Sequence, residues 1–205
     1  DDVVVENGDQ ISFVTGEPFV GNKERAYMNY TQFPLDVKAG ERVLLDDGKL
    51  IFEVVSTNEK DTVVAKVLQG GVLKSKKGVN LPNTNISLPA LTEKDIKDAI
   101  FAIEQEVDWI ALSFVRHAKD IEDLKKLIKA HTTEEIPIIA KIEKPEALAN
   151  IDEIIANCQG LMVARGDLAV ETPAHEVPLR QKELVRKAKE ARIPVIIATQ
   201  MMETM

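Results

Sequence analysis

Charged side chains stand near the end of an apolar run in the second half of the chain. In "IIAKIEKPE", which spans Ile138–Glu146, Lys141 and Glu143 lie two residues apart where a buried strand is expected to end. Residues i and i+2 of a strand face the same side, so these two side chains should point together and Ile142 away. Pro145 suits the first turn of a following helix, where its missing N–H costs nothing. On this stretch alone, a surface Lys–Glu pair at a strand exit is the favoured interpretation.

The stretch "ARGDL" favours a ligand-binding site over a simple surface ion pair. Gly166 between Arg165 and Asp167 allows the backbone to approach a ligand closely, and its N–H can donate to an anion. Asp167 is expected to end the strand that follows the one ending at Glu143. Two carboxylates at neighbouring strand ends suit a hard cation such as Mg²⁺, and Lys141 beside them can neutralise charge on a transferring group. A metal or anion site therefore outweighs an Arg–Asp pair that only braces a turn.

Helices and apolar strands alternate from about residue 88 onward. "DWIALSF", "IPIIAKIE", "GLMVARGD" and "IPVIIATQ" are predicted strands, and "EKDIKDAIFAIEQE", "AKDIEDLKKLIKAH", "PEALANIDEIIAN" and "HEVPLRQKELVRKAKEAR" are predicted helices. Thr92 is expected to cap the first of these helices. The alternation predicts an α/β fold with a parallel sheet, in which ligands collect at the carboxyl ends of strands. The polar residues at those ends are Ser113, Lys141, Glu143, Arg165, Asp167 and Thr199.

Residues 1–87 read instead as all-β. Asp46-Asp47-Gly48 separates two β-rich runs in "ERVLLDDGKLIFEVV", which predicts a hairpin because these residues tolerate positive φ. "DTVVAKVLQGG", "GDQISFVTGEP" and "QFPLDVKAG" are further expected strands of a small barrel or sandwich. In "LKSKKGVNLP", three lysines that include Lys77 precede Gly78, which fits a phosphate-binding loop or a solvated turn equally well. The spacing is not that of a P-loop.

Composition excludes several classes of protein. The 205 residues are 44% hydrophobic and 29% charged, with a formal net charge of −8 and interleaved acids and bases. This balance argues against nucleic-acid and membrane-surface binders, which need clustered basic residues. The single cysteine, Cys158, is expected to be a core thiol and fits a reducing cytoplasm. Trp109 is expected in the core, and His117, His131 and His175 show no metal-ligand spacing.

The motifs together resemble pyruvate kinase. They are "VLLDDGKL", "SKKGVNLP", "LPALTEKD", "LSFVR", "IIAKIEKPEALANIDEII", "GLMVARGDLAVE" and "PVIIATQMMETM", in family order over nearly the whole chain. The resemblance implies an enzyme that moves the phosphoryl group of phosphoenolpyruvate to ADP, giving pyruvate and ATP. It implies a TIM (β/α)8 barrel with an inserted all-β lid, so that residues 1–87 are most of the lid domain and residues 88–205 the central part of the barrel. Mg²⁺ or Mn²⁺, K⁺, a cytoplasmic location and a homotetrameric parent protein are also implied.

The resemblance also implies roles for individual residues. Lys141 matches the lysine that stabilises the transferring phosphoryl group, and Thr199 matches the threonine near the proton-delivery path. Glu143 and Asp167 match the metal ligands. The remaining matches are Arg165-Gly166-Asp167 as the backbone cradle for the substrate carboxylate, Lys77 and Asp47 as nucleotide-binding lid residues, and Ser113 near the monovalent-cation site.

Some features depart from the family pattern or leave alternatives open. Ala169 stands where the family usually has glycine, and "TQMMETM" replaces the commoner T-Q-M-L-E-S-M. Both ends of the sequence look cut, so an internal piece of a longer protein, inactive by itself, is expected. Metal-dependent aldolases and lyases also place a glutamate and an aspartate at barrel strand ends, but lack the lid and the "SKKGVNLP" loop. A fold that only binds metabolites or a partner is the third interpretation.

Overall fold

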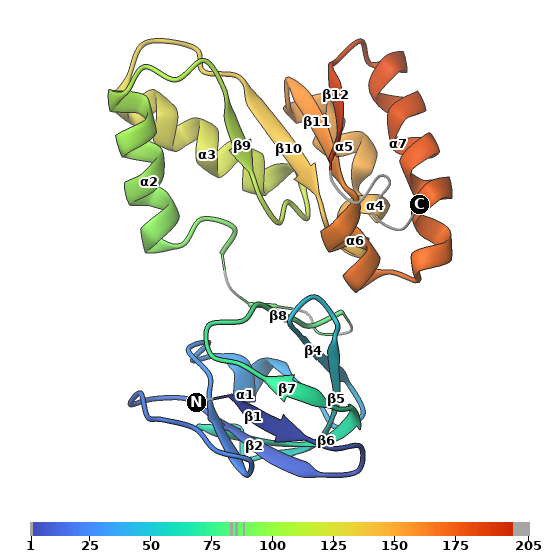
Figure 1. Ribbon diagram of the computed structural model, residues 1–205. Helices are drawn as coiled ribbons and strands as arrows, with labels where there is room; N and C mark the ends of the chain where they lie inside the picture. The colour runs from blue at the N-terminus through green and yellow to red at the C-terminus, as the bar shows by residue number, and fades with distance from the viewer. Residues whose placement is uncertain (1, 83, 85, 88, 199–205) are drawn as a thin grey trace. The chain divides into compact units, whose positions relative to one another are not determined.

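The computed structural model describes residues 2–82, 84, 86–87 and 89–198. The chain divides into two compact units, Asp1–Leu88 and Pro89–Met205 (Figure 1). The first unit is built from β-strands and one short helix, and the second alternates strands with helices. Each unit has its own buried hydrophobic core.

The first unit contains a six-stranded sheet and a two-stranded sheet. The larger sheet has the strand order β3-β2-β6-β5-β4-β8, and β1 pairs with β7 in the smaller one. Phe13 packs edge-to-face against both Phe33 and Phe52 inside this unit, which gives its core a rigid aromatic centre. The elements are β1 (Val3–Val5), β2 (Gln10–Val14), β3 (Arg25–Tyr27), α1 (Phe33–Asp36), β4 (Arg42–Leu45), β5 (Leu50–Thr57), β6 (Thr62–Gln69), β7 (Gly71–Leu73) and β8 (Val79–Asn80).

The predicted hairpin of the first unit is confirmed, and one predicted strand is wrong. β4 and β5 pair antiparallel around the turn, where Asp46, Asp47 and Gly48 have φ values of 52°, 58° and 80°. The segment "QFPLDVKAG" forms the helical turn α1 instead of a strand. Pro34 lies in the first turn of α1, where its fixed φ fits a helix, and this turn buries Phe33 completely.

The second unit is an α/β fold with a curled, half-barrel parallel sheet. Its four strands follow the order β9-β10-β11-β12, and every neighbouring pair is parallel. Helices α2, α3, α5 and α7 pack next to one another in chain order (Figure 1). The elements are α2 (Glu93–Glu104), β9 (Ile110–Leu112), α3 (Ala118–His131), β10 (Ile138–Ile142), α4 (Pro145–Ala149), α5 (Ile151–Asn157), β11 (Gly160–Ala164), α6 (Arg165–Glu171), the 3₁₀ turn η1 (Ala174–Glu176), α7 (Val177–Glu190) and β12 (Val195–Ala198).

Alternation along β10 separates a structural face from a polar one. Ile138, Ala140 and Ile142 are fully buried and belong to the core that the sheet forms with its helices. Lys141 lies between them in sequence and therefore projects from the opposite face of the sheet. The predicted apolar stripe of α3 supplies the helix side of this core, since Leu124 is almost completely buried.

The start of α2 and the cysteine agree with the sequence-based expectations. Thr92 caps α2 in a reciprocal arrangement with Asp95, which satisfies N–H groups that the helix leaves without partners. His117 stands at the N-cap position of α3. Cys158 is buried, and this burial raises the pKa of its thiol.

Other expectations in the second unit need correction. Trp109 precedes β9 and is 43% exposed, so it is not a core residue. The segment "PEALANIDEIIAN" forms two helices, α4 and α5, that meet at Asn150. The strand predicted to run to Asp167 ends at Ala164, because the chain enters α6 at Arg165.

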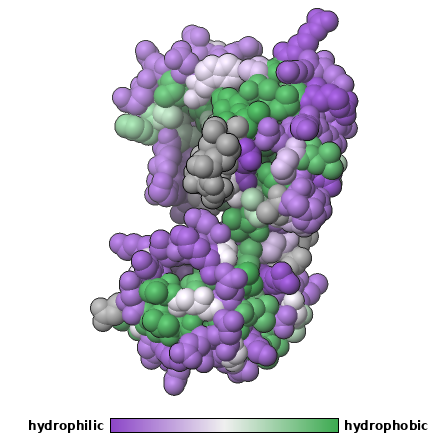
Figure 2. Space-filling view, turned by 45° about the vertical axis from the view of Figure 1, so that its right-hand side comes forward, coloured by the Kyte–Doolittle hydropathy of each residue, from purple (hydrophilic) through white to green (hydrophobic). Residues whose placement is uncertain are grey.

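Hydrophilic residues cover much of the surface visible in Figure 2, with smaller apolar areas between them. None of the helices that the structure describes is long and apolar enough to cross a membrane.

Candidate active site

Three of the predicted site residues meet at the carboxyl ends of β9 and β10. Lys141 Nζ lies 2.7 Å from Glu143 Oε1 and donates a 2.9 Å hydrogen bond to Ser113 Oγ. The register of the two parallel strands brings them together, because Leu112 is paired with Ala140 and Ser113 is the next residue. The expectation that the Lys141 and Glu143 side chains point together is confirmed. They are not a surface pair, since the Glu143 side chain is only 1% exposed.

Glu143 is a buried carboxylate with partners on both oxygens. Oε1 faces the Lys141 ammonium, and Oε2 accepts a 2.7 Å hydrogen bond from the backbone N–H of Phe114. Removing a carboxylate from water is costly unless charge and hydrogen bonds compensate for it. Bonds to an ionised group are also stronger than those between neutral groups. Lys141 and the loop after β9 therefore fix the position of this charged group.

Phe114 makes its bond to Glu143 from a strained backbone. Its φ of 53° lies in the left-handed region, where a bulky residue is a rare outlier. This conformation costs about 1–2 kcal/mol relative to the right-handed one. Strain of this kind persists only where the surrounding structure enforces it, and it occurs preferentially at functional sites.

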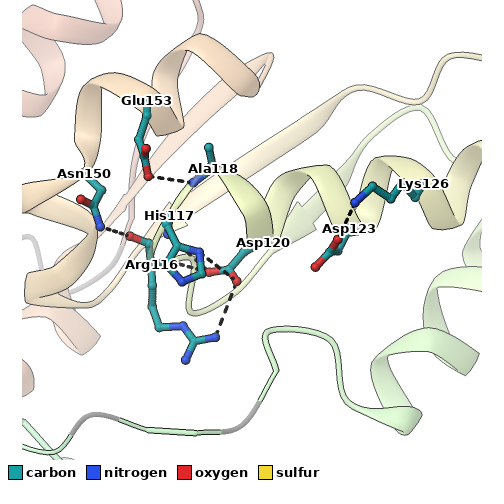
Figure 3. A network of polar contacts seen from close by, with 8 residues as sticks. All are labelled: Arg116, His117, Ala118, Asp120, Asp123, Lys126, Asn150 and Glu153. Atoms are coloured by element: carbon teal, nitrogen blue, oxygen red, sulfur yellow. Dashed lines mark hydrogen bonds and ion pairs between the residues drawn. The ribbon is translucent and has the colours of Figure 1, made fainter.

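A polar network holds the loop that carries Ser113 and Phe114 (Figure 3). Asp120 of α3 accepts a 2.9 Å hydrogen bond from the Arg116 N–H and also pairs with its guanidinium. Asn150, between α4 and α5, donates to the Arg116 carbonyl oxygen at 3.0 Å. The N–H of Ala118 donates to Glu153 of α5 at 3.1 Å. The loop is therefore tied both to its own helix and to the elements that follow β10.

The predicted cradle Arg165-Gly166-Asp167 forms the first turn of α6. Its residues follow Ala164 directly, so they leave the sheet beside the end of β10, the strand next to β11. The N–H groups of a first helical turn have no partners within the helix, and a carboxylate such as that of Asp167 is favourable there. Gly166 is buried, whereas Asp167 is exposed. These residues form a helix turn and not the end of a strand, but they still lie at the same edge of the sheet as Glu143.

The donor set at this edge fits a hard divalent cation. Glu143 and Asp167 supply carboxylate oxygens, and Mg²⁺ is typically bound through one or two carboxylates with its other positions left to water and substrate. Lys141 contacts one Glu143 oxygen and the Phe114 N–H donates to the other, so each oxygen has a second lone pair for a metal. Among the described residues, no group of three or more His, Cys, Asp or Glu side chains could hold a metal without other ligands.

The other predicted site residues belong to the first unit or lie outside the described residues. Lys77, of the first unit, forms an ion pair with Asp46 at 3.0 Å, and Lys49 lies 3.3 Å from the same carboxylate. The hydrogen bond from Lys77 holds the pKa of Asp46 below its ordinary value, and Lys49 adds to this effect. Asp47 is exposed at the hairpin turn. Thr199 lies outside the described residues.

Three residues that were not predicted from the sequence lie at Glu143 or at the adjacent Lys144. They are Phe114 and the buried ion pair of Lys144 with Glu171, whose Nζ and Oε1 atoms are 2.6 Å apart. Phe114 looked like one more apolar residue, and its role depends on a backbone N–H. Charged residues next to helix ends usually lie on the surface, so nothing in the sequence marked Lys144 and Glu171 as partners.

A curled parallel sheet that gathers a lysine and carboxylates at the carboxyl ends of its strands is typical of barrel enzymes. The family model described as "Pyruvate kinase, barrel domain" matches residues 1–205, so the chain belongs to the pyruvate kinase family.

Individual members of the family share much of the sequence. The chain is 49% identical over 187 residues to a pyruvate kinase of Geobacillus stearothermophilus, covering 91% of this chain and 32% of that protein. It is 47% identical over 193 residues to a pyruvate kinase of Bacillus licheniformis, with 94% and 33% covered. It is 42% identical over 201 residues to a pyruvate kinase of Clostridium perfringens, with 98% and 42% covered. The chain thus spans about a third to two fifths of the length of these relatives.

The strained backbone at Phe114 can be tested by comparing two substitutions. Phe114→Ala and Phe114→Gly both remove the ring, but only glycine adopts positive φ without a steric penalty. We expect the glycine variant to have the higher free energy of unfolding, by about 1 kcal/mol, in urea denaturation followed by circular dichroism. At an ordinary strand or helix position the alanine variant would be the more stable one. A more stable alanine variant at position 114 would therefore contradict the strained backbone.

Proposed function

We propose that this chain is part of a pyruvate kinase that transfers the phosphoryl group of phosphoenolpyruvate to ADP, giving pyruvate and ATP. Membership of the family supports the reaction class. The observation that carries the proposal is the contact of Lys141 with Glu143 at the carboxyl end of β10. Phosphoryl transfer depends mainly on positioning and charge neutralisation, and this contact places a cation beside a candidate metal ligand.

Lys141 and Glu143 would do different work in this reaction. Glu143 and Asp167 would hold Mg²⁺ or Mn²⁺, which when bound neutralises negative charge on the substrate oxygens. Lys141 would stabilise the charge of the transferring phosphoryl group with its ammonium. Its hydrogen bond to Ser113 and its ion pair with Glu143 restrict the ammonium before substrate arrives, so little reorganisation is needed.

The other predicted residues would bind substrates and the monovalent cation. The N–H groups of Arg165-Gly166-Asp167 would hold the substrate carboxylate, and Thr199 would lie on the path of the proton to the enolate. Ser113 would lie near a K⁺ site. The first unit would act as an inserted lid whose Lys77 and Asp47 contact the nucleotide. The parent protein would be a cytoplasmic homotetramer, and neither nucleic acid nor a membrane would be a partner.

The reaction itself is tested by pyruvate release from phosphoenolpyruvate and ADP. We expect metal-dependent turnover by the full-length protein and none by residues 1–205 alone, because the described part of these residues contains four parallel barrel strands and a closed barrel needs eight. Turnover by the isolated 205 residues would overturn the second expectation. Binding of phosphoenolpyruvate by the full-length protein without turnover would instead favour a lyase or a metabolite sensor.

Lys141→Met removes the ammonium and keeps most of the side-chain volume. We expect kcat to fall by roughly 10²–10³-fold, as for loss of a group that stabilises transition-state charge, with a much smaller change in phosphoenolpyruvate affinity. The measurement is steady-state kinetics together with equilibrium binding of phosphoenolpyruvate. Lys126→Met is the matched control, because Lys126 is 71% exposed and pairs with Asp123 of its own helix. A variant that loses binding but keeps kcat would refute the assigned role.

Glu143→Gln tests the metal site directly. The amide is a weaker ligand for a hard cation and carries no charge, so the Kd for Mn²⁺ should rise at least about tenfold. Mn²⁺ titration by electron paramagnetic resonance measures this without any turnover. Glu146→Gln provides the control, because it removes the same charge three residues away and should leave the Kd near the parent value. An unchanged Kd in Glu143→Gln would exclude Glu143 as a ligand.

A further inference from the structure

Lys144 and Glu171 form an ion pair in the interior of the second unit. Their Nζ and Oε1 atoms are 2.6 Å apart, and the residues are 8% and 6% exposed. Most other ion pairs among the described residues have at least one side chain that is substantially exposed. A buried ion pair is weak evidence for stability, because apolar residues of similar volume often stabilise a protein equally well. The pair therefore calls for an explanation other than stability.

The pair joins the two chain segments that carry the candidate metal ligands. Lys144 directly follows Glu143 and is the N-cap residue of α4. Glu171 is the last residue of α6, which carries Asp167 in its first turn. Glu143 and Asp167 lie on different elements, one after β10 and one after β11. Lys144 and Glu171 connect those elements by a direct charged contact.

The loop after β9 is linked to these two segments through Phe114. Its backbone N–H donates to Glu143, and its ring centroid lies 6.0 Å from Lys144 Nζ, within the range of a cation–π interaction. Phe114, the second residue after β9, thus contacts both the candidate ligand and the lysine beside it. The three successive strand exits are linked through neighbouring charged groups.

We propose that Lys144 and Glu171 are positioning residues that fix Glu143 relative to Asp167. The inference rests on the proposed function, since it assigns the pair a purpose at that metal site. Mg²⁺ demands nearly ideal octahedral geometry, so two ligands on separate elements must be held at a set separation. The buried ion pair does this by tying the turn after β10 to the helix after β11.

Three variants of the full-length protein separate positioning from simple charge. Lys144→Met and Glu171→Gln each remove one charge, and the double variant removes both, so that the net charge near the site is unchanged. An electrostatic effect alone would strengthen Mn²⁺ binding in Lys144→Met, weaken it in Glu171→Gln and cancel in the double variant. Positioning predicts weaker binding in all three, by about tenfold in the double variant, the size typical of residues that orient metal ligands.

The readouts are the Kd for Mn²⁺ without substrate, kcat, and the melting temperature. Lys126→Met serves as the control, because it breaks an exposed pair on α3 and should change none of them. A lower melting temperature with an unchanged Mn²⁺ Kd in the double variant would overturn the proposal and leave the pair a structural role only. Opposite changes in the two single variants would overturn it equally. If the double variant does not fold, the direction of change in the single variants decides.

The same measurements separate this inference from the proposed function. Failure of the function appears in the parent protein, as an absence of metal-dependent turnover and a Glu143→Gln variant that binds Mn²⁺ normally. Failure of the positioning role appears only in the Lys144 and Glu171 variants, with the parent protein active and Glu143→Gln impaired.

Discussion

The second unit is organised around one buried charge, the carboxylate of Glu143. With a side chain that is 1% exposed, this group has lost nearly all contact with water and depends on the protein for compensation. Lys141 supplies the opposite charge, and Phe114 supplies a hydrogen bond from a strained backbone. The strain is held in turn by the contacts of Arg116 with α3 and with the turn before α5. The contacts of Arg116 thus hold the Phe114 backbone, and the Phe114 backbone and Lys141 together hold the Glu143 carboxylate.

Parallel strand pairing makes this arrangement possible. All four strands end at the same edge of the sheet, so short loops bring residues far apart in sequence into contact. Alternation along β10 gives the two faces of the strand different roles. Ile138, Ala140 and Ile142 pack in the core, whereas Lys141 faces the other side of the sheet. The apolar positions hold the strand in register, and the register places Lys141 next to Ser113. Core packing and site geometry are consequences of the same periodicity.

Sequence reasoning reached the fold and part of the site because both follow from short-range patterns. The alternation of strands and helices after about residue 88, the Asp46-Asp47-Gly48 turn and the Thr92 cap depend on neighbouring residues, and these agree with the structure. The i, i+2 spacing of Lys141 and Glu143 is equally local, and the two side chains do meet. The helical turn at "QFPLDVKAG" was missed because a four-residue helix is too short to show a 3.6-residue period.

The contacts that sequence could not reveal are the long-range ones. Phe114 donates to Glu143 through its backbone N–H, and a backbone hydrogen bond of this kind cannot be predicted from the residue type. Lys77 pairs with Asp46, which lies 31 positions earlier in the sequence. Trp109 precedes β9 and is exposed, although its apolar neighbours in sequence suggested a core position. Each of these depends on three-dimensional neighbours that a linear pattern does not specify.

The ion pairs of the second unit differ in how deeply their side chains are buried. Arg180 of α7 and Glu176, the residue before that helix, are each more than a third exposed, and a pair of this kind contributes little to stability. The pairs Lys141–Glu143 and Lys144–Glu171 are mostly buried, so their charges interact strongly and are expensive to leave alone. A chain that only needed a stable core would place apolar residues there. Two adjacent buried pairs after β10 therefore concentrate costly charge in one place, which fits the proposed role of holding charged groups for phosphoryl transfer.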